Sequence, residues 1–162
     1  MEKHYPQQAY HRNDLNAVIK KTASQELYSC GLYLALSQHK ITKHNPNLNK
    51  IATQAFDEDR EHFLSIAERF DILNSASVKA HLSTHLSNTA ASLKNCDENY
   101  QWILDALQQS ERKSIAYQET ICSMTLGHDY QTFDLAYSLL NDNMQHIDNI
   151  ELLLNQHKAN LS

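Results

Sequence analysis

The stretch AFDEDREHFLSI, residues 55–66, combines an apolar helical face with two side chains that can bind a metal ion. Asp59 and His62 are three residues apart, so in a helix they share one face. Ala55 lies four residues before Asp59, and Ile66 lies four residues after His62, on that same face. The stretch therefore predicts a helix that directs a carboxylate and an imidazole into a core.

On both sides of this stretch, apolar residues recur at steps of three and four, and they define four long segments in all. The first predicted helix begins after a cap at Asn13 or Asp14, and Pro46 breaks the chain after it. Gly127 indicates the turn between the last two helices. The predicted helices span about 13–38, 47–73, 98–124 and 130–158.

The segment between the second and third predicted helices, residues 74–97, is too long for a tight turn. It is polar, and its length suits a crossover connection that lets those two helices run parallel. The whole chain of 162 residues holds only two Gly and two Pro, which favours few, long elements in one domain. We therefore predict an all-α four-helix bundle over residues 13–162, with a long crossover between helices two and three.

The inward faces of all four predicted helices carry groups that can bind metal, in a pattern that repeats. Each half of the chain contributes one Glu and then, on the next helix, an Asp or Asn that is followed three residues later by a His. The six residues are Glu26, Asp59, His62, Glu111, Asn143 and His146. Burying several carboxylates together costs several kcal/mol for each charge unless cations compensate them. Carboxylate and imidazole ligands suit iron or manganese, so a pair of divalent ions is expected at this level of the bundle.

Composition excludes several other classes of protein. The net charge of −5 gives no electrostatic case for nucleic acid, and no apolar run is long enough for a transmembrane helix. Residues 1–12, with Lys3, His4, His11 and Arg12, are only mildly basic and are expected to form a flexible arm. They have no apolar secretion signal, so a cytoplasmic location is expected. The three cysteines have neither redox nor zinc spacing, which predicts free thiols.

Three segments resemble bacterioferritins and the Dps-like mini-ferritins that carry a bacterioferritin-type site. They are QELYSCGLY at 25–33, SERKSIAY at 110–117 and LNDNMQHID at 140–148. The spacing from Glu26 to Asp59 and His62 is similar to that family as well, and the resemblance covers about residues 14–158. It implies a ferritin-like bundle that binds Fe(II), oxidises it with dioxygen or peroxide as a ferroxidase, and stores ferric iron in a shell.

The sequence departs from the family at three positions of the implied site. Asp59 and Asn143 stand where the family has Glu, so the half built on Glu111 and His146 is expected to bind metal more weakly. Manganese or zinc are alternatives to iron. Arg60 stands where a bacterioferritin has the Met that binds haem, so no haem is expected. Asp142 and Glu119 are considered as substitute ligands, and four tyrosines could adjoin the site: Tyr28, Tyr33, Tyr117 and Tyr137.

The resemblance also bears on assembly. Only about twelve residues follow Ile150, so the short fifth helix of the 24-subunit ferritins is not expected. A 12-subunit shell or a dimer is therefore favoured over a 24-subunit shell. Two other functions stay open: a non-storage di-iron oxidoreductase acting on an organic substrate, and a ferritin-like interaction or stress protein with a degenerate site. Asn143 favours the second.

Overall fold

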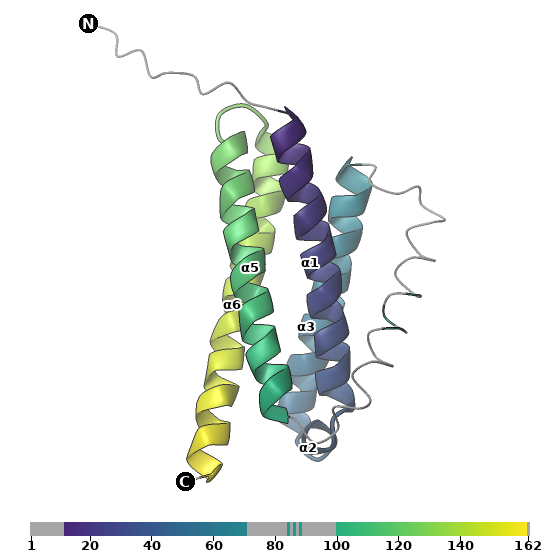
Figure 1. The fold of residues 1–162 in the computed structure, drawn as a ribbon, viewed down its shortest axis with the longest axis vertical. Coiled ribbons are helices and arrows are strands. Elements are labelled where there is room, and N and C mark those ends of the chain that lie inside the picture. The colour runs from purple at the N-terminus through teal and green to yellow at the C-terminus, as the bar shows by residue number, and fades with distance from the viewer. Residues whose placement is uncertain (1–11, 71–83, 85, 87, 89–99, 162) are drawn as a thin grey trace, which may run out of the picture.

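The computed structural model describes residues 12–70, 84, 86, 88 and 100–161. The helices within them are α1 (Arg12–Gln38), α2 (Lys40–Lys43), α3 (Pro46–Phe70), α5 (Tyr100–Thr125) and α6 (Tyr130–Leu161). Figure 1 shows the four long helices side by side in one bundle, with α2 at the end where α1 passes to α3. The predicted all-α four-helix bundle is confirmed.

The direction of the helices agrees with the predicted crossover. In Figure 1, α1 and α6 run from top to bottom, whereas α3 and α5 both run from bottom to top. Because α3 and α5 are parallel, the end of α3 and the start of α5 lie at opposite ends of the bundle. The predicted crossover and the predicted flexible arm lie outside the described residues, apart from Arg12 and residues 84, 86 and 88. Helix α6 continues to Leu161, the last residue that the structure describes.

The helix ends follow local hydrogen bonding. The Asn45 side chain accepts the Leu48 backbone N–H at 3.1 Å and caps α3, whose first residue is Pro46. Gly127 has φ 79° in the turn from α5 to α6, as the sequence indicated. The prediction of a cap at Asn13 or Asp14 is wrong, because α1 already begins at Arg12. The short helix α2 was not predicted, and its first turn is capped by His39, whose Nδ1 accepts the Ile41 N–H.

The core consists of two apolar clusters with a polar layer between them. One cluster lies toward α2 and includes Leu36, Leu104 and Leu154, and the other lies toward the α5–α6 turn and includes Ile19, Ile66 and Leu139. Helix α1 packs on α3 and on α5, and α5 packs along α6, but the backbones of α3 and α6 approach each other at few places. The polar layer between the clusters therefore has room for side chains that meet between α3 and α6.

Two sequence expectations about the periphery can be compared with the structure. Apolar spacing in the third predicted helix puts Trp102 on the same side as Ile103 and Leu107, but Trp102 is 39% exposed, so the prediction is wrong for this residue. Helical positions turn by about 100° per residue, and Ile103 and Leu104 take the buried positions beside it. Cys30 and Cys122 are free thiols, as expected, and Cys96 lies outside the described residues. None of the described helices has an apolar stretch suited to crossing a membrane.

Candidate metal centre

The six candidate residues meet in the polar layer, and each is buried. Glu26 comes from α1, Asp59 and His62 from α3, Glu111 from α5, and Asn143 and His146 from α6. Glu26, Asp59, Glu111 and Asn143 have no exposed surface at all. The period of 3.6 residues explains this arrangement, since each residue lies three or four positions from an apolar residue of the core.

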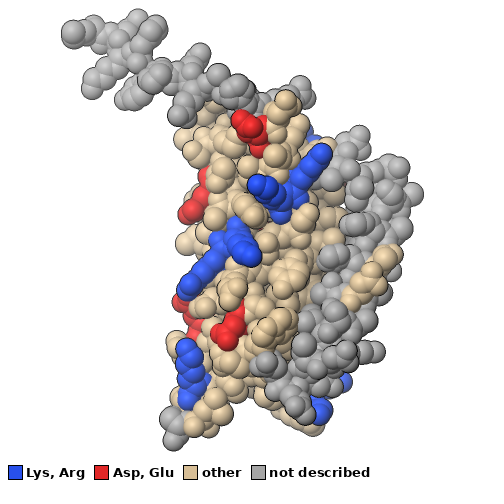
Figure 2. Space-filling model, in the orientation of Figure 1, with Lys and Arg blue, Asp and Glu red and all other residues tan. Residues whose placement is uncertain are grey.

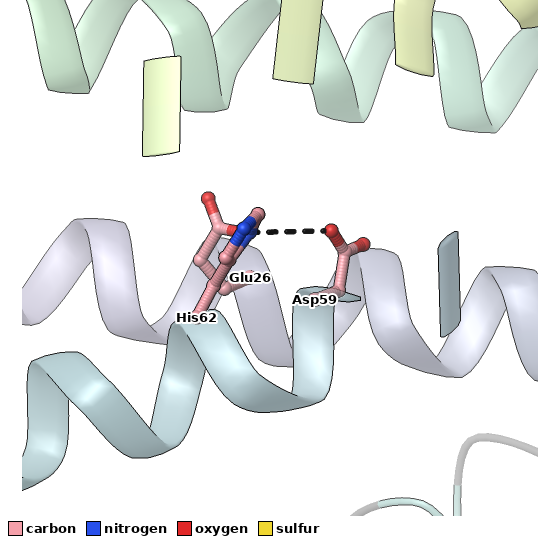
Figure 3. A group of neighbouring side chains, drawn as sticks. All are labelled: Glu26, Asp59 and His62. Carbon is pink, nitrogen blue, oxygen red and sulfur yellow. Dashed lines mark hydrogen bonds and ion pairs between the residues drawn. The ribbon is translucent and has the colours of Figure 1, made fainter. Parts of the chain in front are cut away.

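Glu26, Asp59 and His62 form one group whose potential ligand atoms all lie within 4.8 Å of one another. His62 Nδ1 is 3.1 Å from Glu26 Oε2 and 3.7 Å from Asp59 Oδ1. Figure 3 shows the three side chains pointing toward one another, with Glu26 from α1 and the other two from α3. A cation here would be held by two carboxylates and one imidazole.

Asp59 also belongs to a second group, with Glu111 and His146. His146 Nδ1 is 3.4 Å from Asp59 Oδ1 and 3.5 Å from Glu111 Oε1. The rings of His62 and His146 face each other with their planes inclined by 29° and their centroids 6.3 Å apart. Asp59 therefore stands between two similar groups, which is the position of a carboxylate that bridges two ions.

The outer nitrogen of each imidazole is bound by a carboxylate from the opposite helix. His62 Nε2 is 3.0 Å from Asp142 Oδ2 on α6, and His146 Nε2 is 2.7 Å from Glu58 Oε2 on α3. Such partners fix the orientation of an imidazole and increase its strength as a metal ligand. Asp142 directly precedes Asn143 on α6, and Glu58 directly precedes Asp59 on α3. The two carboxylate–imidazole pairs therefore cross-link α3 and α6 in a symmetrical way.

These contacts change the acidity of the buried groups. Burial opposes the charged form of both imidazoles, but Glu26 and Asp59 raise the pKa of His62 to about 9. In the same way, the neighbouring carboxylates of Asp59 and Glu111 raise the pKa of His146 to about 12. Burial raises the pKa values of Asp59 and Glu111. Without a cation, protons on the two imidazoles therefore provide the positive charge at this layer.

The hydrogen bonding of the layer is incomplete in a way that fits cations. Both oxygens of Asp59, both oxygens of Glu111 and Nδ1 of His146 are buried without a hydrogen-bond partner. Buried polar atoms are normally paired, and unpaired charged ones are costly. The atoms concerned are oxygens and an imidazole nitrogen that converge between the helices, which is the donor set of iron, manganese or zinc.

The structure also corrects the expectations about neighbouring residues. Glu119 is exposed, so it is no substitute ligand, and Asp142 binds His62 from outside the two groups. Of the four tyrosines, only Tyr33 adjoins the centre, with its ring 5.5 Å from that of His146. Tyr28 and Tyr137 are exposed and Tyr117 lies beside Lys20 and Lys21 on the surface, because their positions turn away from the inward helical faces.

Two residues of the polar layer were missed from the sequence. Glu58 could have been found, because Glu58-Asp59-x-x-His62 repeats as Asp142-Asn143-x-x-His146. Gln118 lies seven residues after Glu111 and is completely buried, and its side-chain amide donates to Glu26. The only signal for Gln118 was a polar residue at an inward helical position, and such residues are often exposed.

The outer face formed by α1 and α5 carries charged side chains of both signs. In Figure 2, Lys and Arg side chains lie across the middle of the described part of this face, with Asp and Glu side chains around them. Grooves between these helices are lined by Lys20, Lys21, Tyr117 and, further along, Trp102 and Lys113. None of the six candidate ligands lines these grooves.

Fold and site together define a class: helical bundles with a carboxylate–histidine centre between the helices. The chain belongs to the ferritin family, since the family model for the ferritin-like domain matches residues 16–159. It is also similar to the DNA protection during starvation protein of Pyrococcus furiosus, with 27% identity over 133 residues, which cover 78% of this chain and 69% of that protein. Family and site support a general role in iron storage or detoxification.

Proposed function

We propose that this protein binds two Fe(II) ions in the polar layer of each subunit, oxidises them and stores the product as ferric iron in a homo-oligomeric shell. The observation that carries the proposal is the position of Asp59, which is shared by two buried carboxylate–histidine groups. Glu26 and His62 would hold one ion, Glu111 and His146 would hold the other, and Asp59 would bridge them. Dioxygen or peroxide would accept the electrons, one from each iron.

The protein's own residues prepare this chemistry in three ways. The two apolar clusters exclude water above and below the layer. The outer carboxylates, Glu58 and Asp142, orient the imidazoles so that Nδ1 of each ring points inward. Finally, the two imidazoles hold protons in the ion-free protein that an arriving cation must displace.

The charge of the site is unusual for a two-ion centre. Three inner carboxylates leave one positive charge uncompensated when two divalent cations bind, and Glu58 and Asp142 offset it from outside. Each ion would have the same kinds of ligand, namely one Glu, one His and a share of Asp59. Because Asn143 stands where the family has Glu, the site therefore lacks a second carboxylate that could bridge the two ions. A weaker half at Glu111 and His146 stays a prediction, as do the metal's identity and a cytoplasmic location.

The proposal is tested by metal content and native mass measured on the same sample. After Fe(II) loading, we expect up to two irons per subunit, anomalous scattering between Glu26 and His62, and the mass of a 12-subunit shell. A dimer would contradict storage in a shell. Asp59→Asn should abolish both ions, because both share this carboxylate. Asp57→Asn is the matched control, since Asp57 is exposed on the same helix. Absence of metal near Glu26 and His62 in the wild type would refute the ferroxidase function.

The same measurements separate the alternatives. A non-storage oxidoreductase would bind iron but stay in a low-order assembly, and it would need a substrate pocket that reaches the ligands. An interaction or stress protein with a degenerate site, which Asn143 favours, would assemble without binding iron. DNA protection is a property in the name of the Pyrococcus furiosus relative, and the mixed charge of the α1–α5 face gives it no support here.

A further inference from the structure

Two buried amides converge on one oxygen of Glu26. Gln118 Nε2 donates to Glu26 Oε1 at 2.9 Å, and Asn143 Nδ2 donates to the same oxygen at 3.0 Å. The other oxygen, Oε2, lies 3.1 Å from His62 Nδ1. All of these side chains are buried, and Glu26, Gln118 and Asn143 have no exposed surface. The two oxygens of Glu26 therefore have different surroundings.

The arrangement of donors decides which oxygen can bind an ion. A carboxylate only accepts hydrogen bonds, so the NH₂ end of each amide must face it. With two N–H donors on Oε1, only Oε2 is left for the ion that Glu26 would share with Asp59 and His62. Asn143 uses its NH₂ group on Glu26, and its carbonyl oxygen has no hydrogen-bond partner.

Gln118 is difficult to explain as a packing residue. Its carbonyl oxygen is buried without a partner, so the side chain carries a desolvation cost that Leu or Met of similar volume would not have. Its one hydrogen bond given by the structure goes to Glu26. A buried amide retained for a single contact with a metal ligand indicates a role in orienting that ligand.

We propose that Gln118 is a positioning residue that, together with Asn143, holds Glu26 as a one-oxygen ligand and prevents its carboxylate from turning. The inference rests on the proposed metal centre, since Glu26 has to be a ligand for its orientation to matter. It assigns the NH₂ group of Asn143 to the same task, as a second donor to Glu26. The two amides together thus restrain one terminal ligand.

The test uses Co(II), whose visible absorption reports its ligands, in the full-length protein. Gln118→Met keeps the volume and removes the donor, and Gln118→Leu is a second variant in case the first does not fold. We expect about tenfold weaker binding of one Co(II) and an altered absorption spectrum, in line with losses of about 10–100-fold for partners of metal ligands. Gln109→Met, at an exposed position of α5, is the matched control and should bind as the wild type does.

A double-mutant cycle distinguishes positioning from packing. In a Glu26→Gln background, Gln118→Met should have no further effect on Co(II) binding, because the residue it orients is no longer a carboxylate. Wild-type affinity and spectrum in Gln118→Met and Gln118→Leu would overturn the inference. So would an equal loss of affinity in the wild-type and Glu26→Gln backgrounds. If the wild type binds no Co(II) or Fe(II), the proposed function itself fails, and the inference fails with it.

Discussion

Replacing Glu111 by Gln should make the ion-free protein more stable and the ion-loaded protein less stable. Both carboxylate oxygens of Glu111 are buried without a hydrogen-bond partner, and its closest ion pair is His146 Nδ1 at 3.5 Å. The layer holds three inner carboxylates against two imidazoles, so one negative charge is in excess when all are ionised. Gln keeps the shape of the side chain and removes that charge.

The magnitude follows from the cost of burying an unpaired charged group. Part of that cost is relieved in Glu111→Gln, so we expect a gain of about 1–2 kcal/mol in the free energy of unfolding without metal. For a chain of this size, that corresponds to a rise of about 2–8 °C in Tm. With Fe(II) at a hundred times its Kd, the wild type gains about 2.7 kcal/mol, which the variant should largely lose. Metal therefore reverses which of the two proteins, wild type or Glu111→Gln, has the higher Tm.

The assay is thermal unfolding followed by circular dichroism, in a chelator and then in Fe(II) without dioxygen. Glu119→Gln is the control, because Glu119 is exposed on the same helix and its loss should change stability by at most about 0.5 kcal/mol. A lower Tm for Glu111→Gln in the chelator would refute the reasoning. It would mean that Glu111 stabilises the fold through His146 and is not kept for a cation.

Three further predictions concern metal binding at the same centre and the packing of the core. Cations displace protons from imidazoles with pKa values of about 9 (His62) and 12 (His146). Metal affinity should therefore keep rising as the pH is raised through 9, and calorimetry in different buffers should measure the protons released. Without metal, His62 stabilises the fold fully below its ordinary pKa of 6.5, and this contribution is lost as the pH rises through about 9. Asn143→Glu should raise iron content toward two per subunit, and unchanged content would show that Asn143 is not limiting. Leu107→Ala should cost about 2–5 kcal/mol in denaturant unfolding, whereas Trp102→Ala should cost far less because Trp102 is 39% exposed.

Much of the site could be predicted because helical periodicity is regular. Glu26, Asp59, His62, Glu111, Asn143 and His146 each lie three or four residues from core positions, so their inward direction follows from sequence spacing alone. The repeat of the pattern in both halves of the chain indicated that they lie at one level. Trp102 shows where this reasoning fails, because its helix has more apolar positions than its buried face can hold.

Hydrogen-bond partners across the bundle could not be predicted in the same way. Sequence spacing places Asp142 about 100° away from Asn143, which excludes it from the inward face but does not reveal its contact with His62 on α3. Nor does spacing relate Gln118 on α5 to Glu26 on α1, which are 92 residues apart. Such contacts depend on how the helices are rotated and how far each is shifted along its axis.

The sequence by itself therefore determined the class of fold, the six inward polar residues and the direction in which α3 and α5 run, because these follow from local periodicity and the length of connections. Only the tertiary structure decided that Asp59 stands between two groups and that Asn143 donates to Glu26. It also decided that Asp142 and Glu58 hold the imidazoles from outside. The physical reason is that such contacts depend on differences of a few tenths of an ångström between side chains from different helices, which are set by the packing of the two apolar clusters around the polar layer.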